Sequence, residues 1–278
     1  MPDLSPGVAG ALSPLVRRIV APNPGPFTGP GTNTYLVGID EVAVIDPGPD
    51  DAGHVDAIVG AATPERVKWV LLTHFHPDHI PATARLVART GAEVLASTRR
   101  LPKDATTVVD RVLRDGDTVE GTEFGLEALV TPGHAPEHLC FLLEEERTLF
   151  TGDVVLGGMY SVINPGRGGD MAVYRETLQR LERLRLTRIA PAHGDAIDEP
   201  RAAIRDYLDH RAAREAQIVA LVAAQPRTVA ALVADVYGDS ELPPELVTAA
   251  GWQVLAHLQA LKAAGRVTGT ARSRWCPA

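Results

Sequence analysis

The sequence has few cysteines and lacks any apolar segment long enough to span a membrane. Two cysteines, Cys140 and Cys276, cannot build a disulfide framework, which favours a reducing compartment. No basic region leads into an unbroken apolar segment near the N-terminus, and no later apolar run reaches bilayer-spanning length. Internal repeats and low-complexity tracts are also lacking. We therefore expect a soluble, cytoplasmic protein without a membrane partner.

Length and composition indicate a globular protein. The 278 residues are 45% hydrophobic and 22% charged, which suffices for a sizeable core in one large domain plus a smaller one. Residues 201–278 hold 9 Lys and Arg against 7 Asp and Glu, so the totals of 27 and 35 leave 18 against 28 in residues 1–200. This acidic excess disfavours strong nonspecific binding to polyanions.

A short run after residue 73 concentrates side chains that bind metals. His74, His76, Asp78 and His79 lie within six positions, directly after the apolar stretch 67–73, which predicts a buried strand. Imidazole and carboxylate groups suit zinc and related divalent ions. Pro77 changes the chain direction between the two pairs of ligands, so the spacing predicts two neighbouring metal sites rather than one helical HExxH pair.

This run resembles the signature HxHxDH of the metallo-β-lactamase-fold hydrolases, in which a distant His, an Asp and a final His follow. Residues in the same order here are His134, Asp153 and His193, each after a strand-like stretch. The segments Gly31–Gly38 and Thr131–His134 are similar to the lactamase-β-2-like branch of that family. The resemblance implies an α/β fold, the metallo-β-lactamase αβ/βα sandwich of two mixed sheets flanked by helices.

The resemblance also implies a dinuclear site with two divalent metal ions, which we expect to be zinc. One ion would be held by His74, His76 and His134. The other would be held by Asp78, His79 and His193, with Asp153 as the bridge. Such a pair activates a metal-bridged hydroxide as nucleophile, and Asp78 is the candidate catalytic residue that orients it or relays a proton.

Other polar residues near these motifs are candidates for supporting roles. Asp46 and Thr73 are placed to orient the ligand imidazoles. His138 either supports the ligands or simply begins a strand. The remaining histidines lie outside any ligand motif and are assigned to the core or the surface; they are His54, His210 and His257.

The composition changes after Pro200 and predicts a second domain. Residues 1–200 are expected to form the catalytic domain and residues 201–278 a C-terminal winged-helix-like domain. Helices are predicted at 212–224, at 228–237 with Thr228 as the cap, and at 244–264, followed by the strand-like segments 266–268 and 272–275. Before residue 200, a helix at 170–185 is predicted to begin with Asp170 as its cap. This order resembles the tail of the same branch, although three-helix units alone are common.

Several functions remain open at this point. The resemblance favours an endoribonuclease acting on single-stranded RNA. The acidic balance favours a glyoxalase-II-like or acyl thioesterase acting on a small-molecule ester or thioester. A third alternative is a nucleic-acid-binding regulator whose site has lapsed, which the complete ligand set argues against. The tail is a candidate element for a homodimer or for a wall of the active-site cleft.

Overall fold

The computed structural model describes residues 4–103, 105–238 and 243–278. Contacts divide the chain into two compact units. The first contains the chain up to Thr131 together with Glu137–Met159 and Arg185–Pro200. The second contains Pro132–Pro136, Tyr160–Leu184 and the chain from Arg201 onward.

The first unit is built on two mixed β-sheets. The larger sheet has its seven strands in chain order, antiparallel from β1 to β4 and parallel from β4 to β7. Its strands are β1 (Ala9–Ala11), β2 (Val16–Val20), β3 (Asn33–Val37), β4 (Glu41–Ile45), β5 (Arg66–Leu71), β6 (Glu93–Ala96) and β7 (Arg111–Val112).

The smaller sheet has five strands in the order β12-β11-β10-β9-β8. Only β11 and β12 run parallel, and the other neighbours are antiparallel. Its strands are β8 (Thr118–Glu120), β9 (Gly125–Val130), β10 (Leu139–Leu143), β11 (Thr148–Gly152) and β12 (Arg188–Pro191).

Alternating side chains of the larger sheet enter two different cores. Tyr35 and Leu71 point into the core shared with Phe141 and Phe150 of the smaller sheet. The neighbouring positions, such as Leu72, face the opposite core. This two-residue period is the expected consequence of strand geometry, and it lets one sheet bury both of its faces.

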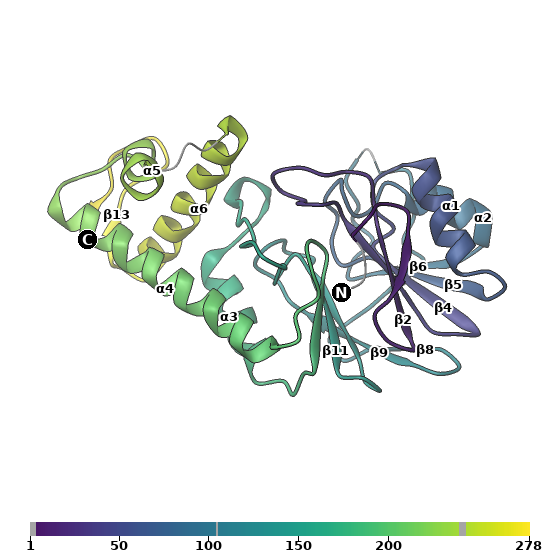
Figure 1. Cartoon of the computed structure of the whole chain (residues 1–278). Coiled ribbons are helices and arrows are strands. Elements are labelled where there is room, and N and C mark those ends of the chain that lie inside the picture. The colour runs from purple at the N-terminus through teal and green to yellow at the C-terminus, as the bar shows by residue number, and fades with distance from the viewer. Residues whose placement is uncertain (1–3, 104, 239–242) are drawn as a thin grey trace. The chain divides into compact units, whose positions relative to one another are not determined.

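Two helices cover the outer face of the larger sheet. They are α1 (Ala52–Ala61) and α2 (Thr83–Thr90), which Figure 1 shows beside β4, β5 and β6. The Asp51 side chain caps α1 by accepting from the backbone N–H of His54, and Gly91 ends α2 in the left-handed conformation.

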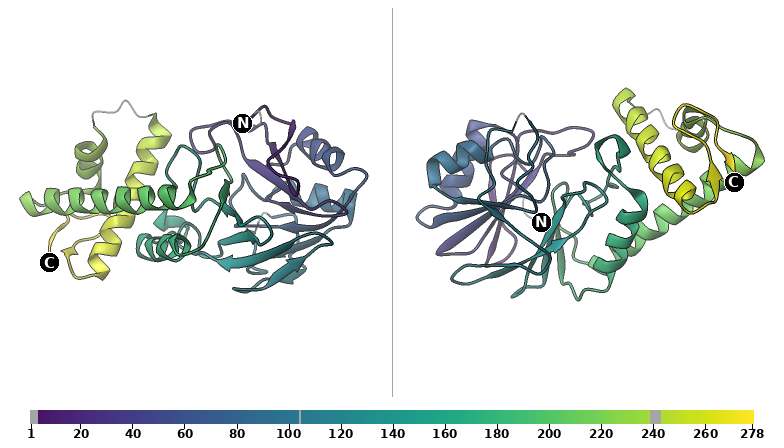
Figure 2. Two further views of the ribbon diagram at one scale, coloured as in Figure 1. Left: turned by 60° about the horizontal axis from the view of Figure 1, so that its bottom comes forward. Right: turned by 180° about the vertical axis from the view of Figure 1, so that it is seen from behind.

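The second unit is mostly helical. Its main elements are η1 (Pro165–Arg167), α3 (Met171–Glu182), α4 (Pro200–Ala224), α5 (Val229–Tyr237), α6 (Pro244–Ala263), β13 (Val267–Thr268) and β14 (Cys276–Pro277). Figure 2 shows α4 as its longest helix. Leu232, Leu258 and Val267 join α5, α6 and the two-stranded sheet of β13 and β14 in one core. Among the described residues, no helix combines the length and the apolar character needed to cross a membrane.

The predicted α/β class with two mixed sheets is confirmed, as are the helix caps at Asp170 and Thr228. The predicted start of the helix at 212 is wrong, because α4 begins at Pro200. Proline is favourable in the first turn of a helix, and the alanine-rich stretch after it contains no helix breaker. The division at residue 200 stays a prediction, since the contact units divide the chain differently.

Candidate metal centre

The loop that follows β5 carries four of the predicted ligands. His74 and His79 are fully buried, whereas His76 and Asp78 are partly exposed. The backbone N–H of His79 donates to the carbonyl of His76 at 3.0 Å, which closes a tight turn between the two pairs. The carbonyl of His79 accepts from the backbone N–H of Gly48 at 2.9 Å and ties this turn to the end of β4.

Six of the seven predicted ligands lie in the first unit, where they form two groups. In each group the possible ligand atoms lie within 4.8 Å of one another. The first group is His74, His76 and Asp153, and the second is Asp78, His79 and His193. The seventh, His134, belongs to the second unit, where it lies on the segment between β9 and β10 with its Nδ1 3.1 Å from Ser161 Oγ. That these side chains bind two metal ions stays a prediction.

The Asp153 carboxylate faces both groups. Its Oδ1 lies 3.3 Å from His193 Nε2 and 3.5 Å from His79 Nε2. Its Oδ2 lies 3.8 Å from His74 Nε2, in the first group. One carboxylate thus directs one oxygen to each group, which is the arrangement required of a bridging ligand.

A buried network fixes how His79 is oriented. Its Nδ1 donates to Asp46 Oδ2 at 2.8 Å, and the Thr73 hydroxyl donates to the same oxygen at 2.7 Å. Asp46 Oδ1 accepts from the backbone N–H of Thr73 at 2.8 Å. Asp46 has a φ of 49°, a left-handed conformation uncommon outside glycine, which aims its carboxylate at the ligand loop.

The other hydrogen bonds determine which ring nitrogens face the carboxylates. Because the Thr73 hydroxyl donates to Asp46, its oxygen accepts from His74 Nδ1, 3.0 Å away. His193 Nδ1 lies 3.3 Å from the carbonyl of Gly31, which can only accept. In the neutral rings of His74, His79 and His193, Nδ1 therefore carries the proton and Nε2 presents a lone pair.

These lone pairs make the site fit a cation. The Nε2 atoms of His79 and His193 face carboxylate oxygens at 3.2–3.5 Å, a repulsive arrangement unless positive charge lies between them. His79 Nε2 is buried and makes no hydrogen bond in the described residues. Imidazole nitrogens with carboxylate oxygens are a suitable donor set for zinc or iron.

The pKa values of the histidines and of Asp153 also indicate that the site favours positive charge. Burial lowers the pKa of His193, but Asp153 and Asp78 outweigh burial and raise this pKa to about 9. The pKa of His79 is raised well above its usual value, because Asp78 and Asp46 outweigh burial. Despite burial, His193 and His79 hold the pKa of Asp153 well below its usual range. The carboxylates thus stabilise positive charge on the imidazoles.

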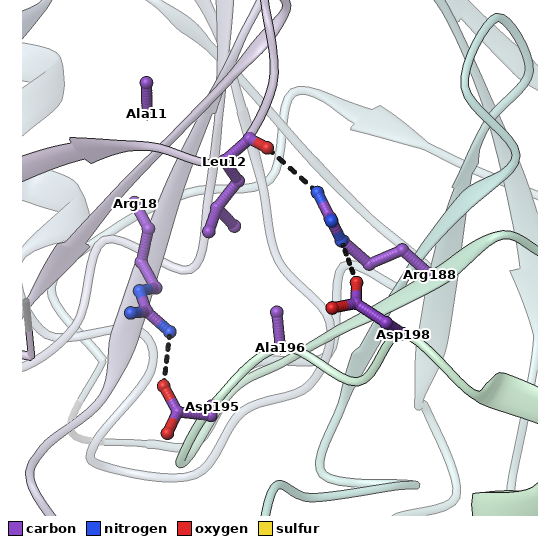
Figure 3. A pocket seen from close by; sticks show the side chains of 7 residues that line it. All are labelled: Ala11, Leu12, Arg18, Arg188, Asp195, Ala196 and Asp198. Atoms are coloured by element: carbon purple, nitrogen blue, oxygen red, sulfur yellow. Dashed lines mark hydrogen bonds and ion pairs between the residues drawn. The ribbon is translucent and has the colours of Figure 1, made fainter. Parts of the chain in front are cut away.

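The loop carrying His193 is anchored at several points. The Asn33 amide donates to the carbonyls of Pro191 and Gly194 at 2.8 and 2.9 Å. Beyond Gly194, Asp195 pairs with Arg18 and Asp198 pairs with Arg188, at 3.7 and 2.8 Å (Figure 3). These two pairs line a cavity of about 280 Å³ that contains none of the predicted ligands. The pairs balance in charge and restrain the loop.

Two supporting features were not predicted from the sequence. Thr131 and Cys140 were not assigned any role near the ligands, yet both lie in a buried hydrogen-bond chain that reaches Asp153. His138, for which two roles were open, belongs to this chain. The signal available in the sequence was the position of His138, four residues after His134 and directly before β10.

Comparison with known families defines the class. The Metallo-beta-lactamase superfamily profile matches residues 27–193, and the profile of the beta-lactamase associated winged helix domain matches residues 228–275. The chain belongs to the metallo-beta-lactamase superfamily, whose members are typically metal-dependent hydrolases.

Three curated relatives have similar sequences. Lactamase-like protein adaB of Aspergillus niger is 36% identical over 212 residues, which cover 75% of this chain and 64% of that protein. Beta-lactamase-like protein 2 homolog of Caenorhabditis elegans is 34% identical, with coverages of 75% and 71%. Thioesterase pkgB of Emericella nidulans is 35% identical, with coverages of 78% and 62%. The aligned part thus spans less than two thirds of adaB and pkgB.

Solved structures share the fold. A beta-lactamase domain protein from Burkholderia ambifaria has a TM-score of 0.84 at 22% identity, covering 100% of this chain and 95% of that one. The protein TTHA1623, solved in a di-iron-bound form, has a TM-score of 0.54 at 26% identity, covering 67% and 96%. The predicted fold and C-terminal winged-helix domain are therefore confirmed.

Proposed function

We propose that this protein is a hydrolase that uses two divalent metal ions, with zinc as the first choice. The observation that carries this proposal is the Asp153 carboxylate, which directs Oδ1 toward His79 and His193 and Oδ2 toward His74. No single-ion site needs a carboxylate placed between two groups of imidazoles. When bound, a metal pair lowers the pKa of water toward neutrality and stabilises the developing oxyanion.

The chain itself supplies orientation and proton transfer. Asp46, Thr73 and the Gly31 carbonyl hold three imidazoles with their Nε2 lone pairs toward the carboxylates. Asp78 has a side chain 26% exposed, against 12% for Asp153, so it is the more accessible of the two carboxylates. We assign to Asp78 the orientation of the nucleophilic water and the transfer of a proton to the leaving group.

For the substrate we propose single-stranded RNA. The C-terminal winged-helix domain supports this choice, because such domains commonly contact nucleic acid through a helix and basic groups. The exposed Arg272 and Arg274 lie between β13 and β14 in this domain and offer contacts for phosphates.

A thioester is the second candidate substrate. One relative, 35% identical, bears the name thioesterase. The same metal pair can attack an acyl carbon, and the net charge of −8 disfavours strong attraction of a polyanion. A nucleic-acid-binding regulator with a lapsed site is disfavoured, because all seven predicted ligands are present in the sequence and six of them form two groups within the first unit.

The two substrates can be separated with one panel. Metal-loaded and chelator-treated protein is incubated with a single-stranded RNA, the matching duplex and an acyl thioester, beside the Asp78→Asn variant. We expect cleavage of the single strand that requires metal and falls by about 100-fold or more in Asp78→Asn. The exposed Asp50→Asn, which loses only a surface pair with Arg85, is the matched control and should keep its activity.

Each alternative result has a distinct meaning. Turnover of the thioester, with RNA neither bound nor cut, would replace the substrate and leave the metal hydrolase standing. Full activity of metal-free protein on any of these substrates would overturn the metal-dependent mechanism itself. Elemental analysis of the active protein decides between zinc and iron.

A further inference from the structure

His138 is a buried histidine that belongs to neither ligand group. Its Nε2 accepts a hydrogen bond from the backbone N–H of Asp153 at 3.2 Å. Because a backbone N–H can only donate, Nε2 must be the unprotonated nitrogen of the neutral ring, and Nδ1 carries the proton. Nδ1 lies 3.0 Å from Thr131 Oγ1, which accepts it. The tautomer of His138 is thereby determined by its partners.

The hydrogen-bond chain continues back toward β11. The Thr131 hydroxyl, having accepted from His138 Nδ1, has two acceptors within reach, Cys140 Sγ at 3.3 Å and the carbonyl of His138 at 3.4 Å. The Cys140 thiol in turn donates to the carbonyl of Thr151 at 3.6 Å. This series of hydrogen bonds begins at the amide of Asp153 and ends at the carbonyl of Thr151. Its two ends are therefore separated in the sequence only by Gly152.

The surroundings of Gly152 show how closely His138 approaches the turn formed by Thr151, Gly152 and Asp153. Its φ is 48°, and a Cβ at this position would lie 2.6 Å from His138 Nε2 and 2.8 Å from Thr73 Oγ1. The His138 ring also stacks on His74, with ring centroids 5.0 Å apart and planes inclined by 27°. The same ring thus rests on the turn before Asp153 and on a ligand of the first group.

We propose that His138 is the positioning residue for the Asp153 carboxylate. The inference rests on the proposed function, in which Asp153 bridges two cations. A bridging carboxylate must reach both ions at once, so a small rotation of its backbone breaks one of the two bonds. The His138 chain fixes this backbone before metal enters, and supporting hydrogen bonds of this kind change metal affinity by about 10- to 100-fold.

The test compares metal affinity in full-length variants. Dissociation constants for Zn²⁺ are measured by chelator competition for the wild type, His138→Leu, His138→Gln and Thr131→Val. We expect His138→Leu to weaken binding by about 10-fold or more, and His138→Gln to recover part of it because its amide oxygen can accept from the Asp153 N–H. Thr131→Val keeps the side-chain volume, removes the acceptor for Nδ1 and should weaken binding to a smaller extent.

A control separates positioning from general destabilisation. His257→Leu replaces another fully buried histidine, which lies in α6 of the second unit. It should leave the Zn²⁺ affinity unchanged, whatever it does to the melting temperature. Equal affinities of His138→Leu and the wild type, or equal losses in His138→Leu and His257→Leu, would overturn the inference. If His138→Leu does not fold, an unchanged affinity of Thr131→Val overturns it.

A second readout does not depend on metal. Amide hydrogen exchange of Asp153 in metal-free protein should accelerate in His138→Leu and recover in His138→Gln, because this amide loses and regains its acceptor. If the wild type takes up no metal, the proposed function fails, while this exchange experiment still decides the role of His138. Unchanged exchange at Asp153 in His138→Leu would contradict it.

Discussion

Asp46 accepts a hydrogen bond from His79 Nδ1 at 2.8 Å, and both side chains are almost completely buried. The bond makes Nε2 the only ring nitrogen of His79 left to bind a cation. It also increases the basicity of the ring, since a carboxylate stabilises the developing positive charge. A residue 33 positions away in the sequence thus determines how a ligand is presented.

This relationship predicts the effect of Asp46→Asn. The amide lacks the negative charge and can donate to His79 Nδ1, which favours the wrong tautomer. We expect the affinity for the second metal ion to fall by about 10- to 100-fold, measured by chelator competition. The exposed Asp50→Asn serves as control. Identical affinities of Asp46→Asn and wild type would show that Asp46 has only a structural role.

A second prediction concerns Gly152→Ala. The added Cβ would meet His138 Nε2 and Thr73 Oγ1 at less than 3 Å, and the left-handed backbone opposes any side chain. We expect a loss of about 2 kcal/mol or more in unfolding free energy, together with weaker metal binding.

Gly158→Ala is the matched control for Gly152→Ala. Its φ is 81°, but a Cβ there would have nothing within 4 Å. It should cost only about 1 kcal/mol in unfolding free energy, the strain of the left-handed backbone alone. Urea unfolding of the metal-free proteins would measure both losses in unfolding free energy. Equal losses in the two variants would mean that the turn before Asp153 is not tightly enclosed.

A third prediction concerns pH and His257. Burial is the main reason that its pKa is lowered to about 3, and the positive charge of Arg211 adds to this. The unfolded chain binds a proton near pH 6.5, whereas the folded chain does not until about pH 3. Stability should therefore fall as the pH drops from 6.5 toward 3, by up to about 1.4 kcal/mol per pH unit.

The variant His257→Leu should remove this dependence. Neither ring nitrogen of His257 has a hydrogen-bond partner in the described residues, so an apolar side chain leaves no partner unsatisfied. Urea unfolding at pH 7 and pH 5 should show that the wild type loses about 2 kcal/mol more than the variant between these two values. Parallel pH profiles would show that His257 does not contribute.

A fourth prediction tests the RNA substrate through its salt dependence. In the double variant Arg272→Gln and Arg274→Gln, each lost phosphate contact should reduce the slope of log affinity against log salt by about 0.7. The metals should stay bound, since all seven predicted ligands precede residue 200. An unchanged salt slope for binding of single-stranded RNA would show that these arginines do not contact phosphates.

The clustering of His74, His76, Asp78 and His79 could be predicted from the sequence because these residues are close together in the chain. His74 to His79 are fixed relative to one another by one tight turn, and the strand before them has an unambiguous apolar pattern. The caps of α3 and α5 were equally readable, because Asp170 and Thr228 act on amides two or three residues away.

Features that depend on pairing between distant segments could not be predicted from the sequence. The contact of Thr131 with Cys140 requires the register of two antiparallel strands, and the sequence alone does not determine which residues become neighbours. The start of α4 at Pro200 was also missed, because tertiary packing and first-turn proline extended the helix beyond its clear apolar period.

The most direct test of the two-metal account is the metal content of Asp153→Asn beside that of the wild type. After loading with Zn²⁺ and removal of free metal, elemental analysis should find about two ions per wild-type chain, as a bridged pair requires. The amide introduced by this substitution lacks the negative charge that two adjacent cations need, so the variant should retain about one ion per chain. Equal metal content in the two proteins would contradict the assignment of Asp153 as the bridge.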